Sequence, residues 1–286
     1  MPGTCILTDS MAQFQNPDYV GHELVYTLPM KVKLGNTFYP DSKDAKLYHE
    51  IFASPYEIMP QLQAPNPTRV AALLTTLGQQ YHSVITILTS TRLSPEISVL
   101  QEMLEQLHGS LTIQIIDSET TGIGLGILVQ EAAAILSQGV SVLKVSRLVR
   151  SFLPHIYTVF CLQNLSYLAQ SGFLDPTQAL TGEIMGIIPF YLIENGRLAP
   201  IQKARSTRQM VDMLDEFIEE FDMLKHIAIM QGYPPFDQEA RSFRERVNEK
   251  FPRISFSEHT LGLGLMSLVG PRCLSVVVME SYEPIE

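Results

Sequence analysis

Short apolar runs alternate with longer amphipathic runs along most of the chain, and this alternation predicts strands joined by crossover helices. In the first half we expect strands over residues 5–7, 24–32, 84–88 and 111–116. Apolar residues three or four positions apart predict helices over about 43–52, 67–77, 95–107, 122–136 and 142–152. The first half is therefore typical of a sheet covered by helices.

The pattern changes after about residue 150. Asn195 and Gly196 separate two alternating apolar runs, which is the strongest hairpin signal in the chain. Further segments are a short helix over 162–170, an acidic amphipathic helix over 207–223, a charged helix over 237–250, and strands over 156–160, 226–230, near 254 and over 274–279. We therefore expect a second α/β domain, joined to the first by the helix over 142–152.

Polar loops follow three of the expected parallel strands: residues 8–10, 89–94 and 117–121. Because ligands of open α/β sheets bind at the carboxyl ends of the strands, these loops are expected to converge on one site. Ser94 is the sharpest candidate, since it precedes Pro95 at the start of a helix. Its hydroxyl and the first free helix amides could hold a carboxylate or phosphate. The alternative is an ordinary helix N-cap serine.

No common catalytic or cofactor motif is found in the sequence. Gly122, Gly124 and Gly126 have the spacing G-x-G-x-G, which fits close helix packing better than a dinucleotide loop. Seven histidines include no pair at metal-ligand spacing, and three distant cysteines indicate neither a zinc site nor a disulfide framework. We therefore expect no metal and no cofactor.

Composition narrows the partners further. Hydrophobic residues make up 45% of the chain, charged residues 17%, and the formal net charge is -10. This acidic balance argues against nucleic acid as a partner, because nucleic-acid binders carry a basic face. The N-terminus lacks the basic start of a signal peptide, and the most apolar run, 261–279, is too broken to span a bilayer. A cytoplasmic protein is expected.

Taken in order, several segments resemble the DegV family of bacterial fatty-acid-binding proteins. The matching segments are ILTDSMA, VYTLPMKV, TSTRLSPEIS, IIDSETTGIGLGILVQEAA, NLSYLAQSGFL and IIPFYLIENGRLAPIQKARS. The resemblance implies an α/β fold of two domains: an N-terminal α/β/α layer with a mainly parallel sheet over 1–150, and a C-terminal α/β layer with a mixed sheet over 151–286. Because the set is ordered over nearly the whole chain, it is more specific than any one segment.

The resemblance also implies a function, namely non-catalytic binding of a long-chain fatty acid in a tunnel between the domains. Ser94 falls on the family serine that binds the carboxylate. Gln63, Thr91 and Ser10 are expected nearby as further carboxylate contacts. Family members of this type can present the lipid to the catalytic subunit of a bacterial fatty-acid kinase, so such a kinase is an expected partner.

Several positions depart from the family pattern. The carboxylate-binding threonine falls on Leu62, and most of the family's basic residues are replaced, so that only Arg205 remains as a phosphate-facing or partner-facing residue. The family histidine aligns with Leu268, or with His259 in an alternative alignment. We therefore expect a divergent member that binds a fatty acid but is a poor kinase subunit.

Two other functions are compatible with the sequence. The first is a hydrolase or phosphotransferase that uses Asp9, Ser10 and Ser94, although no nucleophile–base pair is recognisable in the sequence. The second is an interaction protein whose tunnel is plugged by Leu62 and Phe173.

Overall fold

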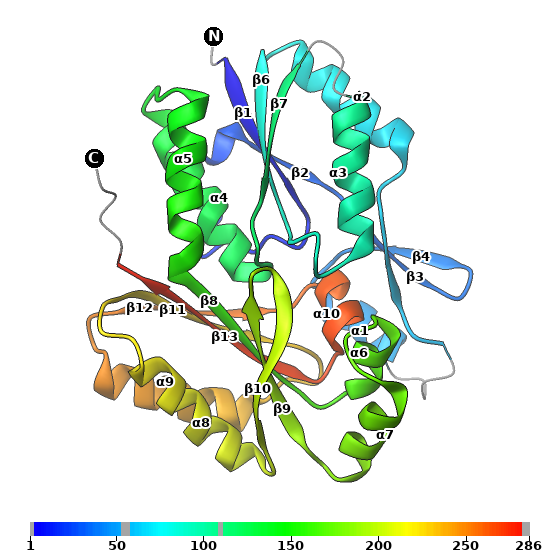
Figure 1. The fold of residues 1–286 in the computed structure, drawn as a ribbon, viewed down its shortest axis with the longest axis vertical. Helices are drawn as coiled ribbons and strands as arrows, with labels where there is room; N and C mark the ends of the chain where they lie inside the picture. The colour runs from blue at the N-terminus through cyan, green and yellow to red at the C-terminus, as the bar shows by residue number, and fades with distance from the viewer. Residues whose placement is uncertain (1–2, 53–57, 108–110, 282–286) are drawn as a thin grey trace.

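The computed structural model describes residues 3–52, 58–107 and 111–281. Within these ranges the strands form a four-stranded sheet, a six-stranded sheet and a small three-stranded sheet. Figure 1 shows the four-stranded sheet and its helices stacked on the six-stranded sheet, with the small sheet at the side. This arrangement confirms the expected α/β class with one parallel and one mixed sheet. The expected boundary at residue 150 falls inside the connecting helix α5 and stays a prediction.

The four-stranded sheet is entirely parallel, in the order β2-β1-β6-β7. Its strands are β1 (Thr4–Asp9), β2 (Val25–Leu28), β6 (Ser83–Leu88) and β7 (Thr112–Asp117). Its helices are α2 (Pro67–Gly78) and α3 (Pro95–Leu107) on one side in Figure 1, and α4 (Gly122–Ser137) and α5 (Val142–Phe152) on the other. The carboxyl ends of β1, β6 and β7 therefore point toward the second sheet.

The six-stranded sheet has the order β10-β9-β8-β13-β11-β12, and only β11 and β12 pair in parallel. Its strands are β8 (Ile156–Leu162), β9 (Ile188–Glu194), β10 (Arg197–Ala204), β11 (Leu224–Gln231), β12 (Ser255–Thr260) and β13 (Cys273–Glu280). Asn195 and Gly196, both at positive φ, form the predicted hairpin turn.

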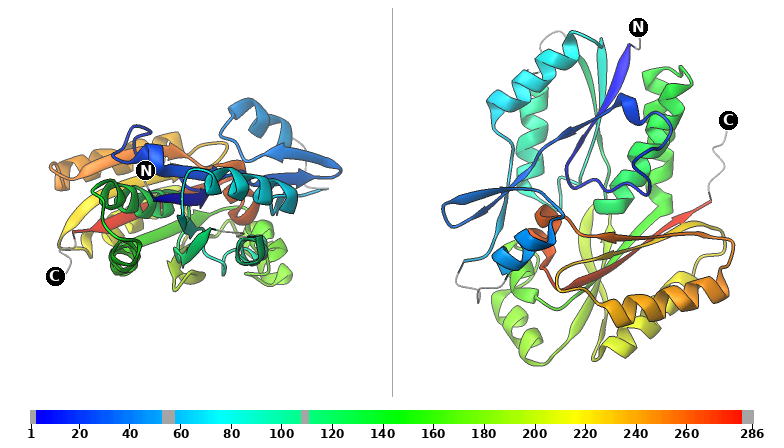
Figure 2. Two further views of the ribbon diagram at one scale, coloured as in Figure 1. Left: turned by 90° about the horizontal axis from the view of Figure 1, so that it is seen from above. Right: turned by 180° about the vertical axis from the view of Figure 1, so that it is seen from behind.

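Both faces of this sheet are buried at its central strands, β8, β13 and β11. On β13, Leu274, Val276 and Val278 pack with helices α8 (Thr207–Glu219) and α9 (Asp237–Lys250). Val277 and Met279 belong to a second cluster that continues into the four-stranded sheet. The back view in Figure 2 shows α8 and α9 on the far side from the parallel sheet. Successive residues of β13 thus face two apolar layers, which explains why residues 276–279 are all apolar instead of alternating with polar ones.

The prediction of one extended segment over 24–32 is wrong. The chain leaves the parallel sheet after Leu28 and starts a new strand, β3 (Lys31–Leu34), in the three-stranded sheet β4-β3-β5. The other two strands of that sheet are β4 (Thr37–Pro40) and β5 (Gln61–Gln63). Pro29 lies at the break, and because proline has no N–H the ladder cannot continue through it.

Short helices complete the junction between the sheets. They are α1 (Ala45–Phe52), α6 (Leu165–Gln170), α7 (Pro176–Ile184) and α10 (Leu263–Val269), with 3-10 turns at His22–Leu24 and Leu153–His155. Helix α10 packs on β3, β5 and α6. In the described part of the chain, no helix is both long and apolar enough to cross a membrane.

Candidate functional site

The three predicted polar loops meet at the carboxyl ends of β1, β6 and β7. The backbone N–H of Thr89 donates to Asp9 Oδ2 at 2.6 Å, and the hydroxyl of Thr91 donates to Asp117 Oδ2, also at 2.6 Å. The N–H of Ser90 donates to the carbonyl oxygen of Thr120 at 2.9 Å. The expected convergence of the loops is confirmed, and their polar groups bind mainly one another.

Two expected carboxylate contacts, Ser10 and Thr91, already have carboxylate partners within the protein. Ser10 Oγ donates to Asp41 Oδ2 at 2.8 Å and accepts the N–H of Met30 at 3.0 Å. Thr91 Oγ1 donates to Asp117, as described above. Since a hydroxyl has one O–H to donate, neither side chain has a free donor for a ligand anion. Both side chains thus form hydrogen bonds that connect one loop to another.

Two aspartates belong to this network: Asp9 is buried, and Asp41 is half-buried. Burial raises the pKa of Asp9 to about 6, against the opposing effect of hydrogen bonds from Thr89 and Met11. Burial also raises the pKa of Asp41, whereas the N–H of Gly264, 2.8 Å from Asp41 Oδ1, lowers it. Asp41 therefore ties the loop after β4 to helix α10 of the second half of the chain.

Ser94 immediately precedes α3 and is buried, with 2% of its surface exposed. Its hydroxyl donates a hydrogen bond of 2.5 Å to the carboxylate of Glu96. Its carbonyl oxygen accepts the N–H of Ile97 at 3.2 Å, as at an ordinary helix start. Ser94 therefore contacts a carboxylate as expected, but the carboxylate belongs to the protein.

A pocket of about 260 Å³ adjoins this helix start. Leu62, Leu93, Pro95, Glu96 and Leu268 are among the residues that line it. The positions expected to carry the family threonine and histidine thus lie together beside Ser94, both as leucines. His259 lines a different pocket, with Lys43 and Tyr233, on β12.

Gln63 lies in an adjoining pocket of about 540 Å³, which also includes Lys31, Pro95 and Glu96. The Nε2 of Gln63 donates to the carbonyl oxygen of Leu62 at 2.8 Å. Because a side-chain amide has two N–H groups, a second donor of Gln63 remains. Of the expected polar contacts, Gln63 is therefore the one that shares a pocket with the start of α3.

Arg205 is remote from these pockets. It follows the last residue of β10, and the first residue of that strand follows the hairpin turn. Arg92 donates a hydrogen bond of 2.9 Å to the carbonyl oxygen of Asn195 in this turn. Strand β10 has 8 residues, which at roughly 3.3 Å per residue is about 25 Å. The exposed Arg205 thus lies at the opposite end of β10 from the turn that contacts Arg92, and its expected role toward a phosphate or partner stays a prediction.

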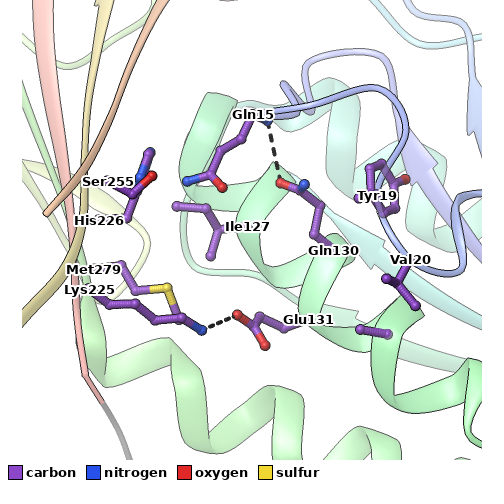
Figure 3. A pocket seen from close by; sticks show the side chains of 11 residues that line it. Gln15, Tyr19, Val20, Ile127, Gln130, Glu131, Lys225, His226, Ser255 and Met279 are labelled. Atoms are coloured by element: carbon purple, nitrogen blue, oxygen red, sulfur yellow. Dashed lines mark hydrogen bonds and ion pairs between the residues drawn. The ribbon is translucent and has the colours of Figure 1, made fainter. Parts of the chain in front are cut away.

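A fourth pocket, of about 350 Å³, lies between α4 and the six-stranded sheet. Figure 3 shows Lys225 and Glu131 paired across it, with Gln15 and Gln130 joined on the α4 side. None of the residues proposed from the sequence for the head-group site lines this pocket.

Ser257 lies between two histidines, an arrangement that the sequence analysis did not predict. Ser257 Oγ lies 3.0 Å from Nε2 of His226 and 2.8 Å from Nε2 of His259. Burial lowers the pKa of both histidines to about 4, with the neighbouring positive charge of Lys43 adding to the effect on His259. His226 and His259 are far apart in sequence, and only the parallel pairing of β11 with β12 brings them together.

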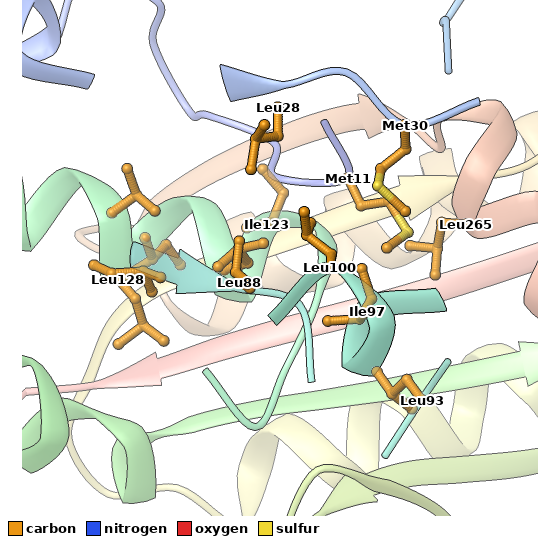
Figure 4. Packing of buried hydrophobic residues seen from close by; sticks show 14 of the residues in the cluster. Met11, Leu28, Met30, Leu88, Leu93, Ile97, Leu100, Ile123, Leu128 and Leu265 are labelled. Carbon is orange, nitrogen blue, oxygen red and sulfur yellow. The ribbon is translucent and has the colours of Figure 1, made fainter. Parts of the chain in front are cut away.

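The largest apolar cluster of the described residues is continuous between the two sheets. It contains Met11 and Met30 from the loops, Ile97 and Leu100 from α3, and Leu265 from α10. Figure 4 shows these side chains buried together, with Leu93 close to the helix start. The apolar interior thus reaches from α4 to the pocket beside Ser94.

A family model described as an uncharacterised protein of the DegV family matches residues 4–281. The chain belongs to the DegV family. Protein DegV of Bacillus subtilis is 21% identical over 276 residues, which are 95% of this chain and 97% of the relative. In this DegV protein, the two positions expected to depart from the family pattern, Leu62 and Leu268, line one pocket together with Glu96.

Solved DegV structures share the fold. A fatty-acid-binding DegV family protein from Streptococcus agalactiae superposes with a TM-score of 0.85, at 20% identity, over 98% of this chain and 99% of that one. The fatty acid kinase B3 protein of Streptococcus pneumoniae, loaded with linoleic acid, superposes with a TM-score of 0.79, at 18% identity, over 97% and 99% of the two chains. No group of three or more metal-binding side chains is found among the residues described here.

Proposed function

We propose that this DegV protein is a non-catalytic carrier of one long acyl chain, whose polar head lies at Ser94 and whose tail lies in the apolar interior between the sheets. The observation that carries the proposal is the continuity of the buried apolar cluster with the pocket beside Ser94. The two streptococcal structures support an acyl ligand, since one is of a fatty-acid-binding protein and the other is loaded with linoleic acid.

The tail would lie among Met11, Met30, Ile97, Leu100 and Leu265. Methionine has three rotatable bonds and no branching, so Met11 and Met30 can change rotamers to admit a chain at small cost. Burial stabilises a chain by about 0.8 kcal/mol per methylene. Sixteen carbons thus contribute on the order of 10 kcal/mol before the cost of association, and the head group has to supply little affinity.

A catalytic role has no comparable support. Ser10 donates to Asp41 and Ser94 to Glu96, and no hydrogen bond from either serine to a histidine is found in the described part of the chain. An activated serine needs a base within hydrogen-bond reach. The Ser257–His259 pair lies on the edge strand β12, and in the described ranges it has no hydrogen bond to Ser10 or Ser94.

We further propose that the protein is a poor subunit for a fatty-acid kinase. Phosphorylation needs a ligand carboxylate that is open to the kinase, and this head-group site places Glu96 where that carboxylate would bind. Arg205, the basic residue kept from the family pattern, lies at the other end of β10.

A chain-length series tests the binding proposal. Saturated primary amides of 8, 12 and 16 carbons are titrated into delipidated protein by displacement of a fluorescent acyl probe. Affinity is expected to rise steeply with length, by up to ~0.8 kcal/mol per methylene. Equal affinity across the series would contradict a buried tail, and no binding of any member would favour an interior that stays filled by its own side chains, including Leu62 and Phe173.

A further inference from the structure

The start of α3 is poorly equipped to hold a ligand anion, although helix starts usually favour one. Pro95 has no N–H, and the N–H of Ile97 is bonded to the carbonyl oxygen of Ser94. Of the first three amides of the helix, only that of Glu96 remains. The hydroxyl of Ser94 is also in use, since it donates to Glu96. A carboxylate at this position would find most of the local donors occupied.

The charge of the pocket of about 260 Å³ also disfavours binding of a ligand anion. Among the described residues that line it, Glu96 is the one ionisable side chain. Four neutral polar side chains line it as well, and of these the hydroxyls of Ser171 and Ser267 already donate to backbone carbonyl oxygens. Gln61 and Gln170 supply the remaining side-chain donors, of which Gln170 gives one N–H to the carbonyl oxygen of Pro60. A ligand carboxylate bound to Ser94 would share one hydroxyl with Glu96. Two carboxylates in such contact cannot both stay ionised without a large cost.

Lys31 is a positively charged residue that lies near Glu96. It comes from β3 and lines the adjoining pocket together with Gln63 and Glu96. Lys31 and Glu96 therefore border the same cavity, and no ion pair between them is found among the described residues. Lys31 is not among the residues that line the pocket with Leu62 and Leu268.

A neutral head group with an N–H or O–H suits the same atoms well. Glu96 uses Oε2 for Ser94, and in the part of the chain that the structure describes no hydrogen bond to Oε1 is present. A carboxylate has about four acceptor positions, and a serine oxygen accepts as well as donates. Ligand donors could therefore bond to Glu96 and Ser94 without displacing their mutual contact.

We infer that the head-group site of this chain selects acyl amphiphiles with an uncharged hydrogen-bond donor, such as a primary amide or alcohol, over fatty-acid anions, and that Glu96 sets this preference. The inference rests on the proposed function, because it names the ligand class of that same site. Glu96 acts by accepting from the ligand and by repelling a second carboxylate.

Competition titrations with oleamide, oleyl alcohol and oleate at pH 8 test the inference on the delipidated full chain. In the wild-type protein, oleamide and oleyl alcohol are expected to bind at least tenfold more tightly than oleate. Glu96→Gln is expected to raise oleate affinity at least tenfold and to change oleamide affinity less than threefold. Glu102→Gln, on the exposed side of the same helix, is the matched control and leaves all three unchanged.

Other outcomes separate the two proposals. Oleate that binds as tightly as oleamide in the wild type, or that is unaffected by Glu96→Gln, would overturn the role of Glu96 while leaving acyl binding intact. Oleate binding that is lost in Lys31→Met would assign the head group to Lys31 and overturn the inference in the same way. If none of the three ligands binds to protein whose melting curve is that of a folded chain, the proposed function itself fails.

Discussion

The hydroxyl of Ser94 donates a 2.5 Å hydrogen bond to the carboxylate of Glu96, two residues further along the chain. In this DegV protein, the serine expected to receive a fatty-acid carboxylate is thus occupied by a carboxylate of its own helix. The leucines at 62 and 268 line the pocket next to this pair. Among the described residues of that pocket Glu96 is the one ionisable side chain, so the head-group end of the site is acidic, and its neutral polar side chains are Gln61, Gln170, Ser171 and Ser267.

Removing the Ser94 hydroxyl is expected to weaken binding of the head group. Ser94→Ala leaves Glu96 without its partner and deprives the ligand of one contact, so oleamide affinity should fall by about 1 kcal/mol, the usual net worth of one hydrogen bond. Isothermal titration measures the change. Ser98→Ala is the control, since Ser98 Oγ donates weakly to the Thr91 carbonyl at 3.4 Å. Equal affinities in wild type and Ser94→Ala would exclude Ser94 from the site.

Acyl-phosphate formation with a bacterial fatty-acid kinase is expected to be slow when this protein supplies the lipid. The combined substitutions Leu62→Thr, Glu96→Thr and Leu268→His remove the competing carboxylate and add three donors, each worth about 1.5–3 kcal/mol to a charged ligand. Turnover should rise at least tenfold in this variant, as followed by radiolabelled phosphate transfer. High turnover of the wild-type protein would contradict the account.

Gly126 is expected to tolerate no side chain, because a Cβ there would lie 1.7 Å from the backbone oxygen of Gln13. Gly126→Ala should destabilise the fold by about 3 kcal/mol or more, since backbone on both sides must move. Gly3→Ala is the matched control, because nothing lies within 4 Å of its Cβ position. Urea unfolding measures both. A neutral effect at Gly126 would contradict the close packing of α4 on the loop after β1.

Stability should depend on pH through the histidines around Ser257. His226 and His259 have pKa values of about 4 in the folded chain, below their ordinary 6.5. Between pH 6.5 and 4 the unfolded chain binds protons that the folded chain does not, so acidification lowers the free energy of unfolding. Asp9 has the opposite effect, because its pKa is raised from 3.8 to about 6 in the folded chain. Between these pH values the folded chain binds a proton that the unfolded chain does not, so acidification raises this residue's contribution to the free energy of unfolding.

A variant separates these contributions. His259→Gln keeps a hydrogen-bonding group beside Ser257 but removes one titration, so the loss of stability between pH 6.5 and 5 should shrink by about 1 kcal/mol. His82→Gln, at an exposed position, is the control. Urea unfolding at a series of pH values provides the measurement, and identical pH profiles for wild type and His259→Gln would exclude a buried neutral imidazole.

The fold was largely readable from the sequence because its signals are local. The helix over 142–152, the turn at Asn195–Gly196 and the three polar loops follow from apolar spacing and turn chemistry. The break at Pro29 was missed, because an apolar run does not reveal which sheet each part joins. Close packing explains the spacing of Gly122, Gly124 and Gly126, as each has a neighbour too near for a Cβ.

The site was less predictable because it depends on which donors are already used. The sequence identified Ser94, Ser10 and Thr91 as hydroxyls near strand ends, but their bonds to Glu96, Asp41 and Asp117 are contacts that only the fold defines. A glutamate two residues after a helix-cap serine was the available signal, and it is equally typical of an ordinary helix start.

Native mass spectrometry of the delipidated protein, mixed with equimolar 18-carbon amphiphiles, tests the central claim most directly. The account predicts a single adduct of one acyl chain per protein, retained on desolvation and absent with an 8-carbon analogue. A protein that stays at its unliganded mass with every 18-carbon amphiphile, while its folded charge-state distribution is preserved, would contradict an acyl-chain site between the two sheets.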